Sequence, residues 1–104
     1  MSVIYIFGAD CKLAGTANDY TGKLNYTRSR RQCKPWIEYS DNQTIHVNNF
    51  PDPSLEEASN FCRNPTKNVG GSWCFTTDPE VPKDFCYVKD CQKPRKFFKS
   101  LKTC

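Results

Sequence analysis

The sequence of 104 residues lacks long hydrophobic runs. Only 38% of its residues are hydrophobic, even when the cysteines are counted. No stretch approaches the roughly 18 consecutive apolar residues that a membrane-spanning helix needs. The sequence therefore predicts no transmembrane segment and no direct insertion into a membrane. A chain this short forms one domain at most, and its apolar core must be small.

Histidine is scarce too, which bears on catalysis and metal binding. His46 is the one histidine, and no two cysteines have the two-residue spacing typical of zinc sites. A reactive cysteine needs an electropositive surrounding and a nearby base, which this sequence does not offer. We interpret His46, within an Ile-His-Val stretch, as a half-exposed strand residue. The sequence predicts no catalytic residue, no metal and no cofactor.

Cysteine, by contrast, is abundant. The seven cysteines stand at positions 11, 33, 62, 74, 86, 91 and 104. Such usage in a short chain is typical of oxidised extracellular proteins, which indicates a secreted protein or the ectodomain of a membrane protein. The first six cysteines alone allow fifteen pairings, and their spacing does not choose among them. Disulfides are expected to supply the stability that the small core cannot.

Two glycosylation motifs agree with an extracellular location. Asn25 and Asn42 each begin an Asn-x-Thr sequon, and both are predicted glycosylation sites. The N-terminal segment 1–10 contains a short apolar run, Val3 to Phe7, that lacks the preceding basic residues and the length of a signal peptide. We interpret residues 1–10 as a leader or an appended segment.

Positive charge is concentrated at the C-terminal end. The segment 92–104 carries five Lys or Arg and no acid, so the net charge of +4 arises there. The five cations, which are a predicted polyanion-binding site, are Lys93, Arg95, Lys96, Lys99 and Lys102. A sulfated glycan or an acidic protein surface would suit them, and a solvated linker is the alternative. A nucleic-acid partner is not expected for an oxidised extracellular protein.

Turn-forming residues leave little room for regular secondary structure. Short strands are expected at 73–77 and 85–88, where aromatic and β-branched residues surround a cysteine. Ser54 with Glu57 three residues later predicts a capped helix of one or two turns within 54–61. The rest of the chain is expected to be loop.

Several motifs in the sequence resemble those of a known protein family. They are Asp19-Tyr20-Thr21-Gly22, Gln32-Cys33-Lys34-Pro35-Trp36, Asn60-Phe61-Cys62-Arg63-Asn64-Pro65 and Trp73-Cys74-Phe75-Thr76, followed by Cys86 and Cys91. With these motifs, residues 11–91 resemble a kringle domain, and 92–104 would form a basic tail or linker. The departures include Arg30 where the family usually has Gly, and Ser72 where it usually has Pro.

The resemblance implies a fold. It implies a small disulfide-rich domain, mostly loops with short antiparallel strands. The family's disulfide pairing would join Cys11 to Cys91, Cys33 to Cys74, and Cys62 to Cys86. For loops of these lengths, chain-entropy estimates give roughly 3 to 4.5 kcal/mol for each bridge. The expected apolar packing around the bridges comes from Trp36, Tyr20, Phe61 and Leu55.

The resemblance also implies a ligand site, because many kringles grip a lysine side chain between aromatic rings and two carboxylates. The site positions that match this pocket are Trp73, Phe75, Phe85, Thr66, Asn68 and Lys83. The aromatic positions are kept, but the two acidic positions hold the neutral residues Thr66 and Asn68. Lysine binding is therefore predicted to be absent. Trp73 is either a protein-contact residue beside cations or a packing residue of the core.

The function that the resemblance implies is recognition. We expect a non-catalytic extracellular protein-interaction module that lacks the lysine-binding acidic pair and belongs to a receptor or a growth factor. Its motifs are similar to kringles of Ror-type and muscle-specific receptor tyrosine kinases and of hepatocyte growth factor. The alternatives are a regulatory kringle of a trypsin-like zymogen, similar to those of plasminogen, and a free-standing secreted protein. Cys104, left over from the pairing, is expected to bond another module or chain, and a free thiol is the alternative.

Overall fold

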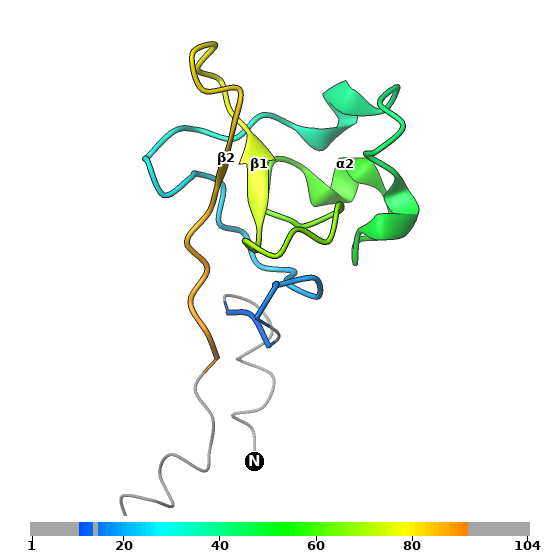
Figure 1. The fold of residues 1–104 in the computed structure, drawn as a ribbon. Coiled ribbons are helices and arrows are strands. Elements are labelled where there is room, and N and C mark those ends of the chain that lie inside the picture. Colours follow the sequence, from blue (N-terminus) through cyan, green and yellow to red (C-terminus); the bar gives the residue numbers. More distant parts are fainter. Residues whose placement is uncertain (1–10, 14, 92–104) are drawn as a thin grey trace, which may run out of the picture.

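The computed structural model describes residues 11–13 and 15–91. Two 3-10 helices come first, η1 (Trp36–Tyr39) and η2 (Val47–Asn49), followed by the short α-helix α2 (Leu55–Ala58). The strands β1 (Trp73–Phe75) and β2 (Lys83–Phe85) follow and form a two-stranded sheet. Figure 1 shows the helices to one side of this sheet and long loops around both. The expected loop-rich fold with short antiparallel strands is confirmed.

The hairpin of β1 and β2 is antiparallel, with Trp73 opposite Phe85 and Phe75 opposite Lys83. The predicted first strand is confirmed in part, whereas the predicted second strand, 85–88, is misplaced and shares only Phe85 with β2. The reason lies in where the later backbone groups bond. The Phe85 carbonyl accepts a hydrogen bond from the Arg28 amide, and the Lys89 carbonyl accepts one from the Lys12 amide. The Cys86 amide bonds the Ser72 carbonyl just before β1, so the pairing with β1 itself ends at Phe85.

Helix α2 begins where the sequence predicts. The Ser54 hydroxyl accepts a hydrogen bond from the Glu57 amide at 3.1 Å, which satisfies one of the free amides of the first turn. Ser59 then adopts a positive φ of 50° and ends the helix after one turn. Leu55 and Ala58 are its buried residues, so the cap fixes how this turn presents its apolar side to the core.

His46 does not lie in a strand, so that interpretation is wrong. It is exposed and precedes η2, and its carbonyl accepts a hydrogen bond from the Asn49 amide at 2.8 Å. The neighbouring Ile45 is buried at 2% exposure. Ile45 is thus buried in the core next to a helical turn and not through strand pairing.

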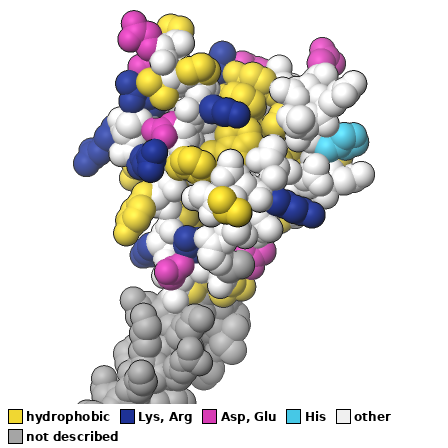
Figure 2. Space-filling model, viewed as in Figure 1, with side chains coloured by type: hydrophobic (Ala, Val, Ile, Leu, Met, Phe, Trp, Pro, Cys, Tyr) yellow, Lys and Arg dark blue, Asp and Glu magenta, His cyan; other side chains and the backbone are white. Residues whose placement is uncertain are grey.

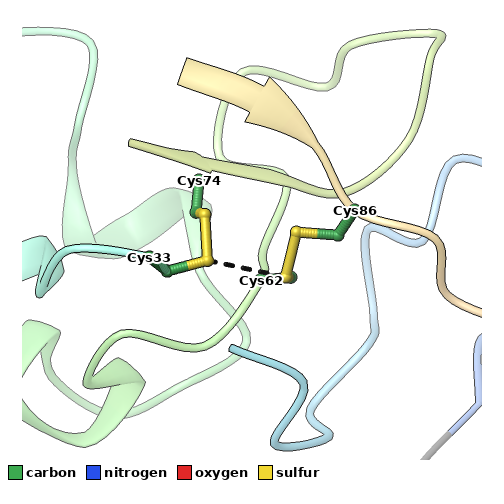
Figure 3. A group of neighbouring side chains, drawn as sticks. All are labelled: Cys33, Cys62, Cys74 and Cys86. Atoms are coloured by element: carbon green, nitrogen blue, oxygen red, sulfur yellow. Dashed lines mark hydrogen bonds between the residues drawn. A yellow bond between two sulfur atoms is a disulfide. The ribbon is translucent and has the colours of Figure 1, made fainter. Parts of the chain in front are cut away.

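The disulfide pairing is the one that the family resemblance implied. Cys11 bonds Cys91, Cys33 bonds Cys74, and Cys62 bonds Cys86. Figure 3 shows the two inner bridges side by side, and the Sγ atoms of Cys33 and Cys62 are 3.9 Å apart. All six cysteines are buried. The two inner bridges are thus part of the hydrophobic core as well as crosslinks.

The aromatic core is centred on Trp36, which is 0% exposed. Its ring meets those of Phe50, Trp73 and Phe75 edge-on, at centroid distances of 5.1, 5.2 and 5.8 Å. Its indole nitrogen donates a hydrogen bond to the Phe61 carbonyl at 2.7 Å. Of the other expected core residues, Tyr20 and Leu55 are buried and Phe61 is half-buried.

A buried ion pair ties the N-terminal loops to this core. Arg63 is 2% exposed, and its Nε and Nη2 atoms donate to the Asp52 carboxylate at 2.8 and 3.1 Å. Its Nη1 atom donates to the carbonyls of Gly22 and Cys62, both at 2.8 Å. The guanidinium carbon also lies 5.5 Å from the ring centre of Tyr20. No local sequence pattern marks this pair, because Asp52 and Arg63 are 11 residues apart in the chain.

Candidate functional site

A pocket of about 210 Å³ opens beside the hairpin, and we call it the recognition pocket. Its lining residues are Arg28, Thr66, Asn68, Trp73, Lys83, Asp84 and Phe85. On the face drawn in Figure 2, hydrophobic side chains gather near the centre, with Lys and Arg side chains around them. The pocket therefore combines aromatic surface with both signs of charge.

Trp73 contributes its indole to the pocket but is itself mostly packed. It is 5% exposed, and its Nε1 atom donates a hydrogen bond to the Thr66 hydroxyl at 3.2 Å. The Lys83 ammonium lies 5.4 Å from the centre of the indole ring, within the range of a cation–π contact. The ring face that a ligand cation would use is already next to a cation of the protein.

Phe85 lies on β2, and its ring needs the glycine at position 70. A Cβ atom added to Gly70 would approach two ring atoms of Phe85 to 2.5 and 2.6 Å, which is too close for any side chain. The Arg28 guanidinium carbon lies 5.5 Å from the centre of the same ring. Both aromatic residues of the pocket therefore carry a cation of the protein near their rings.

Asp84 supplies the carboxylate of the pocket. Its oxygens accept hydrogen bonds from the Ser29 hydroxyl at 2.6 Å and from Arg28 Nε at 3.3 Å, and one also bonds the Phe85 amide. Partial burial alone would raise the pKa of Asp84, but these hydrogen bonds and the Arg28 charge outweigh it and lower that pKa. Asp84 is ionised at neutral pH, and the protein's own groups already surround it.

Asp84 and Arg28 belong to the site although they were not among its predicted residues. The family resemblance directed attention to the positions after Pro65, whereas Arg28 and Asp84 are separated by 56 residues and meet only in the folded chain. No local sequence pattern marks such a pair. The structure thus adds one cation and one anion to the predicted positions.

The loop that carries Thr66 and Asn68 is held from within. The Asn64 side chain donates to the carbonyls of Thr16 and Asn68, at 2.7 and 2.9 Å, and accepts from the Asn68 amide at 2.8 Å. The Asn68 side chain accepts from the Gly70 amide. The two neutral residues at the predicted acidic positions therefore take part in internal hydrogen bonds.

Five of the six predicted pocket positions come together here, namely Trp73, Phe85, Thr66, Asn68 and Lys83. Phe75 lies outside the lining. Its ring stacks on that of Tyr39, with centroids 3.8 Å apart and an interplanar angle of 14°, so it packs the core. The predicted polyanion residues Lys93, Arg95, Lys96, Lys99 and Lys102 lie outside the described residues, as does Cys104.

The two sequons differ in their surroundings. Asn42 is exposed, and its side-chain oxygen accepts hydrogen bonds from the Thr44 amide and hydroxyl at 2.9 and 2.8 Å. Asn25 is half-buried, and the hydroxyl of its sequon residue Thr27 bonds to Ser29 and to the Arg31 amide. Glycosylation of both asparagines stays a prediction.

The inner cysteines also form a cluster of four sulfur atoms. The Sγ atoms of Cys33, Cys62, Cys74 and Cys86 all lie within 4.8 Å of one another (Figure 3). Metals bind the thiolate form of cysteine, and each of these sulfurs is engaged in a disulfide. In this oxidised state the four sulfurs pack in the core and offer no thiolate to a metal.

The disulfide bridges and the short hairpin agree with a comparison to known protein families. Residues 11–91 match the model of the kringle domain. The match covers most of the chain, and the chain therefore belongs to the kringle family. Kringles are non-catalytic modules that bind proteins and are typically extracellular. Among the described residues, no helix is long and apolar enough to cross a membrane.

Proposed function

We propose that this kringle is an extracellular protein-interaction module whose recognition pocket does not bind lysine side chains. It belongs to a receptor or a growth factor, and the pocket faces a partner protein. The supporting observation is the pair of cations beside the aromatic rings, Lys83 at Trp73 and Arg28 at Phe85. A ligand ammonium would have to approach both of them.

The absence of the two carboxylates would greatly weaken the binding of a lysine ligand. A lysine-binding pocket supplies two carboxylates, whereas Thr66 and Asn68 carry no charge. Each charge-assisted hydrogen bond contributes about 1.5 to 3 kcal/mol, so losing two weakens binding by roughly a hundredfold or more. Asp84 does not compensate, because Ser29 and Arg28 already occupy its oxygens.

The test is a titration with 6-aminohexanoate, a lysine analogue, followed by tryptophan fluorescence. Trp36 is fully buried and Trp73 lines the pocket, so a ligand-dependent change reports on Trp73. We expect no saturable change up to about 1 mM, given the missing carboxylates. Saturation at micromolar concentrations would refute the proposal.

A gain-of-function variant makes the test sharper. Thr66→Asp with Asn68→Asp restores two carboxylates, and an aspartate at 66 keeps an acceptor for the Trp73 indole nitrogen. We expect this variant to bind 6-aminohexanoate at least about tenfold more tightly than the parent chain. The matched control, Asn48→Asp with Asn49→Asp, adds the same two negative charges at exposed positions away from the pocket lining and should change nothing.

Two further parts of the proposed function lie in the C-terminal segment. The basic residues of 92–104 contact a sulfated glycan or an acidic protein, and Cys104 bonds a neighbouring module or a second chain. Both rest on the composition of that segment. Heparin affinity with and without residues 92–104 tests the first, since equal retention would remove the tail from consideration.

A further inference from the structure

A second, larger hollow lies outside the recognition pocket and plays no part in the function proposed above. It consists of two cavities of about 460 and 350 Å³ that share Leu24, Tyr26 and Tyr87 in their walls. Tyr87 is 82% exposed and Tyr26 is 48% exposed, which is unusual for two large side chains on one surface. We call this hollow the tyrosine groove.

Four cations line the tyrosine groove, namely Lys23, Lys89, Arg28 and Arg30, and no carboxylate lines either cavity. Arg28 also lines the recognition pocket and is paired there with Asp84. For the other three, no ion pair with an acidic group is present among the described residues. The groove thus carries uncompensated positive charge beside exposed aromatic rings.

Arg30 stands in a backbone conformation that disfavours it. Its φ is 69°, in the left-handed region where a residue with a side chain is strained by about 1 to 2 kcal/mol relative to glycine. The described structure gives the Arg30 side chain no hydrogen bond or ion pair that would compensate. Three other described residues with side chains also adopt positive φ, so the conformation marks a turn, and the relevant feature of Arg30 is its exposed guanidinium without an acidic partner in the groove wall.

We propose that the tyrosine groove binds a segment of a sulfated glycan chain. The sulfate groups pair with Lys23, Lys89 and Arg30, since guanidinium and ammonium groups are the donors that such anions prefer. The rings of Tyr26 and Tyr87 offer flat apolar faces to the sugar rings, and their hydroxyls bond to the sugar hydroxyls. This site lies on the body of the kringle domain and is separate from the basic tail.

A polymeric anion fits the distribution of charge better than an acidic protein surface does. The cations of the groove are spread along two adjoining cavities, Lys23 and Lys89 in one and Arg28 and Arg30 in the other. An extended array of cations favours a ligand with regularly repeated charges. Asn25 also lines the groove, so an N-glycan there would compete for the same space.

The experiment measures the affinity of a size-defined heparin octasaccharide for the full chain, produced without N-glycans so that Asn25 is bare. Lys23→Gln with Lys89→Gln, and separately Tyr87→Ala, change exposed side chains and should leave the fold intact. We expect each variant to lose about tenfold in affinity. The double lysine variant should also show a weaker dependence on salt, because fewer counterions are released on binding.

The matched control is Lys34→Gln with Lys67→Gln, which removes the same charge from two residues that line none of these cavities. Its affinity should fall by less than about twofold. An equal loss in the control would show that only overall charge matters and would overturn the proposal. Unchanged binding by Tyr87→Ala would overturn it as well.

Two further arms separate the ligand classes and the tail. A desulfated octasaccharide should bind at least about tenfold more weakly than the sulfated one. A polyglutamate peptide of equal charge should bind more weakly too, and equal binding would contradict the assignment to a glycan. With the five tail cations changed to Gln, the Lys23/Lys89 effect should persist, and its disappearance would assign the binding to the tail.

Discussion

Ser72 is a buried polar residue without a visible partner. It is 2% exposed, and its hydroxyl has no hydrogen-bond partner among the described residues. A buried hydroxyl that loses its bonds to water and gains none in the protein destabilises the folded state by about 1 to 3 kcal/mol. The Ser72 carbonyl, by contrast, accepts a bond from the Cys86 amide, and a change of side chain leaves that bond in place.

Ser72→Ala is therefore expected to raise the free energy of unfolding by about 1 kcal/mol, measured by urea denaturation. Ser54→Ala is the matched control, because it makes the same chemical change at a hydroxyl that caps α2. That variant should lose about 1 kcal/mol. If the two variants lost stability equally, the Ser72 hydroxyl would have to possess a partner in solution.

Arg63 is a single buried residue that makes several polar contacts. Its guanidinium bonds Asp52 and two carbonyls and lies near the Tyr20 ring. Replacing both charges of such a pair can be neutral, whereas removing one leaves the other charge buried and unpaired. The sequence Cys-Arg-Asn-Pro did not reveal this, because Asp52 lies 11 residues away in a loop whose path depends on the whole fold.

At the scale of elements, two carboxylates join the hairpin to the loop before Cys33. Asp84 of β2 accepts hydrogen bonds from Ser29 and Arg28, and Asp78 of the hairpin turn pairs with Arg31 at 2.8 Å. The hydrogen bond from Arg31 and one from the Glu80 amide lower the pKa of Asp78. The pKa of Asp84 is lowered as well, although burial opposes it.

The two lowered pKa values determine how the stability of the folded chain depends on pH. Both carboxyl groups have lower pKa values in the folded chain than their ordinary value of 3.8, so the unfolded chain binds more protons near that pH. Their contribution to stability is complete well above pH 3.8 and is lost as the pH falls through the folded pKa values. The hairpin and the loop it contacts should therefore loosen in acid.

Asp84→Asn removes the contribution of one of these two carboxylates. We expect it to destabilise the protein by about 1 to 2 kcal/mol at pH 7, because charge-assisted bonds become neutral ones, and to flatten the fall in stability between pH 5 and pH 2. Thermal unfolding across that pH range measures both. Asp41→Asn, at an exposed residue, is the control and should keep the parent profile. An unchanged acid limb in Asp84→Asn would contradict the assignment.

The hairpin also shows the limits of local sequence patterns. The pattern around Trp73 predicted β1 because its aromatic and cysteine side chains pack the core. The pattern of Phe85 to Val88 looks equally strand-like, yet the register with β1 pairs residues 83–85, and the backbone at Lys89 and Asp90 pairs with Lys12 instead. Ser54 predicted its helix correctly, because a cap depends only on residues three apart. Asp84 could not be predicted, since its partners are defined by tertiary folding.

For the whole molecule, the small size of the apolar core decides how much of the stability must come from the disulfide bridges. A domain of about 80 residues with few aliphatic side chains has a narrow margin of stability. The cysteine framework carried the family resemblance, and through it the pairing and the fold class. The spacing alone left fifteen pairings open, so the family motifs around the cysteines were what made the prediction possible.

The three disulfide bridges should not contribute equally to the stability of the folded chain. Chain-entropy estimates give about 4.5 kcal/mol for the outer bridge, with a separation of 80 residues, and about 4 and 3.4 kcal/mol for the inner ones, with separations of 41 and 24. Entropy alone ranks the outer bridge first. The inner sulfurs, however, lie beside one another and in the same hydrophobic cluster as Trp36, and the outer bridge is not part of that cluster.

Removing an inner bridge therefore costs packing in addition to entropy. We expect Cys33→Ala with Cys74→Ala to lose the cooperative thermal transition, whereas Cys11→Ala with Cys91→Ala keeps one at a lower temperature. Both variants carry Cys104→Ser, so that no free thiol can mispair, and near-ultraviolet circular dichroism follows the tryptophans. If the outer deletion were the more damaging, chain entropy would dominate, and the view of the inner disulfides as packing groups of the core would be wrong.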